Sequence, residues 1–138
     1  MPARDFFHET VKNALIKDSW TITHDPYKIL IGKRKGYIDL AAEKLIAAER
    51  DSQKIVVEVK SFLGVSSLDE FEDALGQFLI YKVALERHEP DRKLFLAVSE
   101  VFYEDFFDDS FFVEIAQRYE VHLLIFDDKK EEILQWIN

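Results

Sequence analysis

The chain contains no cysteine and has few glycines, prolines and methionines. Its 138 residues include four Gly, three Pro and one Met. The absence of cysteine excludes disulfides, thiolate metal sites and cysteine nucleophiles. No low-complexity or linker-like segment is present, and 48% of the residues are hydrophobic. We therefore expect a single domain over residues 1–138 with a core of its own.

Basic residues are too few for an ordinary nucleic-acid-binding protein. The chain has 18 Lys and Arg against 27 Asp and Glu, which gives a net charge of −9. Because the neutralisation of phosphates supplies much of the affinity for nucleic acids, this composition counts against DNA binding. One basic cluster, Lys33-Arg34-Lys35, is the exception, and residues 103–109 are strongly acidic. A role on DNA must therefore be local, or must depend on a metal ion or a partner.

Long apolar runs are absent as well. No stretch of ~18 apolar residues and no secretory signal is found, so we expect a soluble cytoplasmic protein without membrane contact. Aromatic residues are plentiful by contrast, with twelve Phe, five Tyr and two Trp. This abundance predicts a core that is rich in aromatic rings.

The hydrophobic periodicity predicts an α/β fold with a mixed central sheet flanked by helices. Helices are expected over Arg4–Lys17 and from a capping box at Ser67 and Glu70 to about His88. The acidic-aromatic stretch at 102–112 predicts two short helices that bury Phe, or alternatively a partner surface. The strands are expected at Trp20–Thr23, Lys28–Ile31, Ile55–Phe62, Lys93–Ser99, His122–Phe126 and Ile133–Ile137.

The segment from Tyr37 to Ala48 is harder to interpret, because its alanines are compatible with helix or strand. A loop is expected before it at Gly32–Gly36, and a polar break after it at Arg50–Gln53. This arrangement favours a hairpin or a small meander that leads into the strand beginning at Ile55.

That strand carries two charged residues inside an apolar run. Side chains alternate along a strand, so Ile55, Val57 and Val59 share one face while Glu58 and Lys60 share the other. Taken alone, the two charges are typical of the solvated face of an edge strand. They are also what half of an active site would contain.

Asp39 interrupts an apolar run in the same manner, and it lies on a neighbouring predicted strand. Together with Glu58 it would form a hard-oxygen site suited to Mg²⁺ or Mn²⁺. Such a cation acidifies a bound water and stabilises charge on a phosphate under attack. Lys60 would orient that water or stabilise the transition state, and the carbonyl of Val59 would complete the ligand set.

The spacing of Asp39 and Glu58-Val59-Lys60 resembles the D…(D/E)-x-K signature of the PD-(D/E)XK nuclease superfamily. The resemblance implies a restriction-endonuclease-like fold over the whole chain and phosphodiester hydrolysis in DNA. The chain departs from the pattern at Ile38, which stands where proline often precedes the aspartate.

Two further positions support this resemblance. Glu9 corresponds to a first-helix glutamate that serves many members as an extra metal ligand, although a surface charge explains it equally well. Gln77 and Tyr81 resemble the Gln-x-x-x-Tyr element of RecB-like members, which implies a supporting catalytic role for Gln77. Packing against the sheet explains that pair about as well.

A narrower resemblance covers essentially the whole chain. Residues 38–50, 55–62 and 76–82, with the ending Leu134–Ile137, resemble the XisH family of cyanobacterial proteins, named as fdxN-element excision controlling factors. The resemblance implies a part in developmentally regulated DNA rearrangement, with DNA and a small XisI-like protein as partners. The oligomeric state stays open, and a homo-oligomer is one alternative.

The leading hypothesis is a Mg²⁺-dependent endodeoxyribonuclease that acts in DNA excision. Its rival is a non-catalytic accessory protein that keeps a nuclease-like fold and regulates a site-specific recombinase through protein–protein contacts near Phe106 and Phe107. The net charge of −9 favours the rival. A small-molecule phosphohydrolase is a third alternative, which only the metal site supports. The histidines show no metal-ligand spacing and receive no role: His8, His24, His88 and His122.

Overall fold

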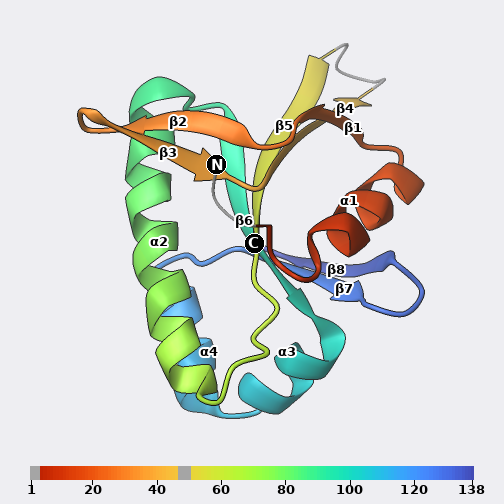
Figure 1. Cartoon of the computed structure of the whole chain (residues 1–138), viewed down its shortest axis with the longest axis vertical. Coiled ribbons are helices and arrows are strands. Elements are labelled where there is room, and N and C mark those ends of the chain that lie inside the picture. The colour runs from red at the N-terminus through yellow and green to blue at the C-terminus, as the bar shows by residue number, and fades with distance from the viewer. Residues whose placement is uncertain (1–3, 47–50) are drawn as a thin grey trace.

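The computed structural model describes residues 4–46 and 51–138, which form a layered α/β fold (Figure 1). Its helices are α1 (His8–Lys17), α2 (Ser67–His88), α3 (Glu100–Phe106) and α4 (Ser110–Arg118). Its strands are β1 (Thr21–His24), β2 (Tyr27–Ile31), β3 (Arg34–Ile38), β4 (Leu40–Ile46), β5 (Asp51–Val59), β6 (Arg92–Ser99), β7 (Leu123–Asp127) and β8 (Glu132–Ile137). None of these described helices combines the length and apolarity needed to cross a membrane.

The strands build a six-stranded sheet and a separate two-stranded hairpin. The order in the sheet is β1-β4-β5-β6-β7-β8, while β2 pairs with β3. The pairings of β5 with β6 and of β6 with β7 are parallel, and the outer pairings are antiparallel. Figure 1 shows α2 on one side of this sheet and α1 on the other. The predicted restriction-endonuclease-like architecture, a mixed central sheet flanked by helices, is thereby confirmed.

Both faces of the central strands are covered, so the core consists of two clusters. In β6, Leu94, Leu96 and Val98 lie in the cluster beneath α2, whereas Phe95 and Ala97 lie in the cluster beneath α1. This is the alternation that the sequence of β6 predicts. The same alternation in β4, β5 and β7 gives each strand an α1 side and an α2 side.

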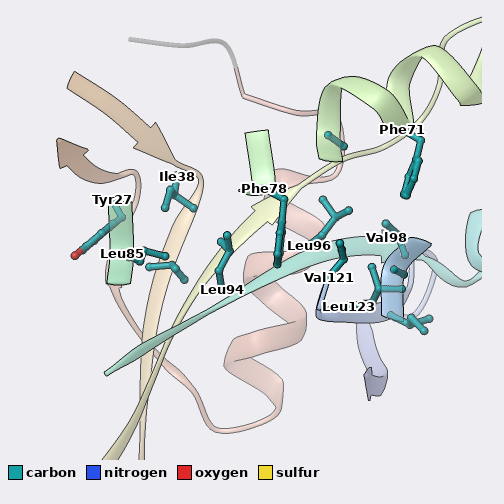
Figure 2. Close-up of a cluster of buried hydrophobic side chains, with 14 of the residues drawn as sticks. Tyr27, Ile38, Phe71, Phe78, Leu85, Leu94, Leu96, Val98, Val121 and Leu123 are labelled. Atoms are coloured by element: carbon teal, nitrogen blue, oxygen red, sulfur yellow. The ribbon is translucent and has the colours of Figure 1, made fainter. Parts of the chain in front are cut away.

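The cluster beneath α2 is shown in Figure 2. Phe71, Phe78 and Leu85 follow one another at seven-residue intervals, about two helical turns, and therefore project from one side of α2. They are buried in the same cluster as Leu96 of β6 and Leu123 of β7. Full burial of such a side chain contributes roughly 1.5–3 kcal/mol to stability. The seven-residue repeat is thus the reason why α2 lies along the sheet.

The first helix begins at His8, and its predicted start at Arg4 is wrong. The carboxylate of Asp5 accepts the backbone N–H of Phe7 at 2.9 Å, which holds the preceding residues in a turn. The same carboxylate accepts the N–H of Ser61 at 3.0 Å. Asp5 therefore connects the beginning of α1 to the segment that follows β5.

The cap of α2 differs from the predicted capping box by one residue. The hydroxyl of Ser66, and not that of Ser67, accepts a helical N–H, which belongs to Asp69 at 3.2 Å. Glu70 accepts the N–H of Gly64 at 3.1 Å instead. A short polar residue with extended backbone is preferred at the N-cap, and both serines meet the first condition. Only Ser66 has the extended backbone, so the sequence alone left the choice between them open.

The loop predicted at residues 32–36 is a tight hairpin turn. Arg34 already pairs with Ile31, so only Gly32 and Lys33 form the turn. Gly32 has a φ of 62°, a left-handed conformation that glycine adopts without steric cost and that such turns require. The basic cluster therefore lies at the exposed tip of the β2–β3 hairpin, which crosses α2 in Figure 1.

The ambiguous segment before β5 is extended as far as it is described: Tyr37 and Ile38 end β3, and after a bend at Asp39 the chain forms β4. β4 ends at Ile46, and residues 47–50, which include the predicted end of this segment, lie outside the described residues. The polar break was predicted too long, because Ser52 and Gln53 already belong to β5 and pair with β4. Cross-strand pairing overrides the weak strand preference of these polar residues.

Helices α3 and α4 bury most of the phenylalanines in the acidic-aromatic stretch. Phe102 and Phe107 are buried, and Phe106 is partly buried. Phe102 stacks on Phe62 with 3.8 Å between the ring centroids and 8° between the planes. Phe111 is exposed, as are the acidic side chains between the rings. The amphipathic-helix interpretation thus describes this stretch except at Phe111, and a contact surface that uses Phe107 would require unfolding.

Phe78→Ala tests the packing of α2. Removal of this buried ring should lower the free energy of unfolding by about 3–5 kcal/mol, because a cavity remains beneath the helix. Ile80→Ala, on the same helix at a side chain that is 53% exposed, should change it by no more than about 0.5 kcal/mol. Urea denaturation followed by circular dichroism measures both. Equal losses in the two variants would contradict the assignment of the buried side of α2.

Candidate functional site

Glu58 is a buried carboxylate near the end of β5. Because β5 pairs with β4 on one side and β6 on the other, the interpretation as an edge strand is wrong. Val57 and Val59 belong to the cluster beneath α1, so the alternation points Glu58 to the α2 side. The residue is only 8% exposed. A carboxylate at such a position requires a compensating partner.

Asp39 is the neighbouring carboxylate, and it lies at the bend between β3 and β4. The bend carries the chain from the hairpin into the sheet. Leu40 pairs with Val57 across the antiparallel ladder, which brings Asp39 level with Glu58. Asp39 Oδ2 accepts the backbone N–H of Val59 at 2.7 Å. Backbone pairing thus brings the two predicted acidic residues together.

The two carboxylates are close enough to share a proton. The pKa of Glu58 is raised to about 10, first by burial and then by the hydrogen bond and negative charge of Asp39. The positive charge of Lys60 lowers it in part. Near neutral pH the pair therefore holds a proton that separate carboxylates would release. This proton occupies the place that a cation would take between two acids.

Lys60 lies at the end of the same strand and on the same side as Glu58. Its backbone N–H donates to the carbonyl of Ala97 at 3.2 Å, which continues the parallel ladder by one residue beyond β5. Among the described residues, its ammonium group has no hydrogen bond or ion pair. The charge is near enough to lower the pKa of Glu58, although the ammonium group is bound to no described side chain.

Helix α2 contributes Tyr81 and Gln77 to the surroundings of the pair. The pKa of Tyr81 is raised to about 12 by burial and by the negative charges of Glu58 and Asp39. Gln77 lies four residues earlier, on the same side of the helix. Its side-chain Oε1 is buried, and it has no partner among the described residues. The predicted Gln-x-x-x-Tyr pair therefore lies on the side of α2 that borders the carboxylates.

Helix α1 brings His8 close to Asp39, whereas Glu9 is exposed at the surface. His8 is 2% exposed, and its Nδ1 lies 3.9 Å from Asp39 Oδ1. Glu9 is exposed and is hydrogen-bonded to Arg4 at 2.6 Å. Adjacent helical residues point about 100° apart, so His8 can be buried while Glu9 stays at the surface.

His8 belongs to a network of charges around Asp25. The carboxylate of Asp25 lies 2.7 Å from His8 Nε2 and 2.7 Å from Lys12 Nζ, and Arg4 lies 3.6 Å away. Burial alone would raise the pKa of Asp25, but the hydrogen bonds from Lys12 and His8 outweigh it and hold the pKa below its usual value. Asp25 is therefore an ionised partner of the buried histidine.

Among the described residues, one group of three side chains has potential metal-ligand atoms that all lie within 4.8 Å of one another. It consists of His8, Glu9 and Asp25. Asp25 is already occupied by His8 and Lys12, and Glu9 by Arg4. These contacts explain the trio as an ion-pair network. The network adjoins the predicted site through His8, whose Nδ1 lies 3.9 Å from Asp39 Oδ1.

The sequence-based interpretation missed His8 and Asp25. A signal for His8 was present, because it precedes Val11 by three residues and Leu15 by seven, the helical spacing of a buried position. All three are buried in the structure. Asp25 stands in the turn after β1, and only the packing of β1 against α1 brings it to His8. Local spacing contains no signal for that contact.

The chain is held in an unusual backbone conformation just after the site. Phe62 has a φ of 54°, in the left-handed region that residues other than glycine rarely adopt. Its ring is stacked on Phe102, and the neighbouring Ser61 is bound by Asp5. Such a conformation persists only where the surroundings enforce it. The turn after Lys60 is therefore fixed from two sides.

The donor set of Asp39 and Glu58 fits a divalent cation. Two carboxylates in contact are the hard-oxygen ligands that Mg²⁺ and Mn²⁺ take. The unpartnered Oε1 of Gln77 is a further oxygen on the α2 side. Asp39 Oδ2 already accepts the N–H of Val59, so Oδ1 is the oxygen of Asp39 that does not take part in this hydrogen bond.

The comparisons with known proteins agree with one another. The family model described as XisH protein matches residues 1–134. A crystal structure of an XisH family protein from Nostoc punctiforme is 46% identical and covers 97% of this chain and 100% of that one, with a TM-score of 0.88. A fdxN element excision controlling factor protein from Anabaena variabilis is 48% identical and covers 98% and 100%, with a TM-score of 0.89. No curated protein matches the chain.

The proton on Glu58 predicts a dependence of stability on pH in metal-free buffer. The folded pKa is raised, so between about pH 5 and 9 the folded chain binds a proton that the unfolded chain has lost. Stability from this group is therefore lost as pH rises, with a slope of at most about 1.4 kcal/mol per pH unit. Glu58→Gln should remove that loss and be more stable than wild type at pH 9.

Urea denaturation at several pH values in EDTA checks this prediction. The stability gained by Glu58→Gln should increase from pH 5 to pH 9. Glu72→Gln removes an exposed carboxylate from α2 and should show no such increase. A gain for Glu58→Gln that is the same at all pH values would contradict the shared proton.

Proposed function

The chain belongs to the XisH family, and we propose that it acts in the excision of a DNA element by metal-dependent hydrolysis of phosphodiester bonds. The observation that carries this proposal is the contact between two carboxylates, Asp39 and buried Glu58, at the end of a central strand. A solved relative is named an excision controlling factor, which supports a role in DNA rearrangement. The PD-(D/E)XK signature, a prediction from the sequence, is the reason for choosing hydrolysis.

Asp39 and Glu58 would hold the cation, with Mg²⁺ or Mn²⁺ as the expected ion. A cation there supplies positive charge to the phosphate under attack and acidifies a water molecule. Release of the Glu58 proton accompanies the binding, because ligands must be deprotonated. Affinity for the metal should therefore increase with pH.

Lys60 is the residue that acts directly on the reacting groups in this proposal. Its ammonium group is uncommitted among the described residues and lies at the end of the strand beside the carboxylates. There it would orient the attacking water and stabilise the negative charge of the transition state. The fixed turn at Phe62 limits the movement of the backbone next to it. Gln77 would position this arrangement from α2.

The β2–β3 hairpin would bind the DNA backbone. Its exposed basic cluster lies at one end of β3, and Asp39 follows the other end. The four residue steps from Lys35 to Asp39 span about 13 Å at strand spacing. A local positive charge of this kind is compatible with the net charge of −9, because only the DNA phosphates that contact the hairpin need to be neutralised. An XisI-like partner, which family membership implies, would add to this weak binding.

A non-catalytic accessory role is the second candidate. The net charge of −9 and two exposed apolar side chains, Val101 and Phe111, favour it. These side chains lie on α3 and α4 among exposed acidic residues, a composition suited to contact with a basic protein. In this case the carboxylate pair would remain from a catalytic ancestor, since a protein can keep a fold after it has lost the activity.

Lys60→Ala tests the catalytic proposal. Nicking of supercoiled plasmid by the purified protein with Mg²⁺ or Mn²⁺ should decrease about 10²–10³-fold, because the variant loses charge stabilisation at the phosphate. Asp39→Asn should abolish both nicking and metal binding. Lys82→Ala, a lysine of α2 that is paired with Glu120 at the surface, should nick at the wild-type rate.

Two outcomes decide against catalysis. Equal nicking by wild type and Lys60→Ala would show that the activity does not come from this site. Absence of nicking by wild type with either metal, alone and with an XisI-like protein, would favour the accessory role.

Lys33→Ala combined with Lys35→Ala tests the DNA contact. Affinity for duplex DNA should fall, and the slope of log K against log salt should decrease by about 1–2, since two phosphate contacts are lost. Lys129→Ala combined with Lys130→Ala changes the net charge equally at the turn between β7 and β8, and should have a smaller effect. Fluorescence anisotropy at several salt concentrations measures both, and equal effects would contradict a specific role of the hairpin.

A further inference from the structure

Helix α2 exposes apolar side chains on the face that is turned away from the sheet. Ile80 is 53% exposed and Val83 is 60% exposed, although the opposite face of the helix is buried in the core. Leu30 of the β2–β3 hairpin, which is 48% exposed, lines the same groove of about 450 Å³ as these two side chains. Apolar side chains that gather at a surface in this way mark a contact site more often than single ones do.

The exposed residues of α2 form one stripe along the helix. At about 100° per residue, seven of them fall within an arc of about 100°. They are Asp69, Glu72, Asp73, Gly76, Ile80, Val83 and Arg87. The stripe is acidic where the helix begins, apolar in its middle and basic where the helix ends. Charges of these signs also suit the dipole of the helix itself, but the dipole does not account for the apolar middle.

Gly76 lies in the middle part of this stripe. Among the amino acids only proline is a poorer helix former than glycine. A methyl group at Gly76 would meet no heavy atom of the described residues within 4 Å. The packing of a single copy therefore gives no reason for a glycine here. The close approach of a second backbone would give one, because glycine has no side chain to keep it away.

The stripe is complementary to itself when two copies of α2 lie antiparallel. A two-fold axis level with Phe78 brings together residues that lie equally far before and after this position. Asp69 of one copy then meets Arg87 of the other, since each is nine residues from Phe78. Ile80 lies over Gly76, since each is two residues from Phe78. A two-fold contact uses the same patch on both copies, so each of these pairs forms twice.

We propose that the exposed stripe of α2 is the contact surface of a symmetric homodimer. The apolar middle supplies most of the affinity, whereas the exposed Asp69–Arg87 pairs add little and instead fix the antiparallel register. Gln77 lies about 100° around the helix from Gly76, on the side that borders the carboxylates. The candidate site therefore stays outside the contact, and the inference does not depend on the proposed function.

Sedimentation velocity of the whole chain, without DNA or metal, tests the dimer. One helix from each copy makes a small interface, so we expect a Kd of roughly 10–100 µM and a monomer below that range. Ile80→Glu should weaken dimerisation at least about 10-fold, because it buries a charge against the partner helix. Gly76→Gln should do the same, because its side chain occupies the space of the partner backbone. Lys129→Asp, at the β7–β8 turn on the other side of the molecule in Figure 1, should dimerise as wild type does.

Charge reversal tests the two-fold arrangement itself. Asp69→Arg and Arg87→Asp should each weaken dimerisation about 3–10-fold, since like charges then meet at both ends of the contact. An equimolar mixture of the two variants should dimerise about as strongly as wild type, because both ion pairs are restored in the mixed dimer. All four positions changed on α2 are exposed, and circular dichroism checks that each variant is folded.

Every outcome decides for or against this contact. Wild type that stays monomeric up to about 0.5 mM would overturn it. A dimer that Ile80→Glu and Gly76→Gln leave unchanged would place the contact elsewhere, and a mixture of the charge variants that binds no better than either alone would contradict the two-fold register. Recovery in the mixture, with loss in Ile80→Glu, would establish it. Failure of the nicking assays leaves these measurements unaffected, because they involve neither metal nor DNA.

Discussion

The contact between buried Glu58 and Asp39 is the constraint on which the rest of the structure depends. A carboxylate on the inner side of a central strand loses its hydration, and a second carboxylate beside it adds repulsion. The pair is tolerated because the raised pKa of Glu58 favours its protonated form and because Asp39 accepts the N–H of Val59. A fold that served stability alone would place apolar residues here, so the pair is evidence of a function.

The elements around this pair act as its support. Two clusters of apolar residues pack against β5 from both sides. The backbone that carries the charged residues at the end of this strand is therefore held in place. Asp5 and the stacked ring of Phe62 fix the chain immediately after Lys60. Sites on strands are held more precisely than sites on loops. The aromatic residues of α3 therefore contribute to the site without touching the reacting groups.

Membership of the XisH family and the geometry of the site explain an apparent conflict in the sequence. A chain with a net charge of −9 is poorly suited to bind DNA as a whole, yet relatives are named for control of DNA excision. The structure concentrates positive charge at the tip of one hairpin and negative charge on α3 and the turn between α3 and α4. DNA and a basic protein partner would therefore meet different faces of the molecule, and the two proposed roles are compatible in space.

The sequence by itself determined the helices, most of the strands, the two sides of the central strands, and the approach of Asp39 to Glu58 and Lys60. Periodicity is a local property, and antiparallel pairing then brings the two acids level. Only the tertiary structure decided that His8 is buried next to Asp39 while Glu9 is exposed. It also brought Asp25 to His8 and buried Glu58 beside Asp39, which raises the pKa of Glu58. These depend on where α1 docks against the sheet and on how deeply a side chain is buried, and neither is encoded in the spacing of neighbouring residues.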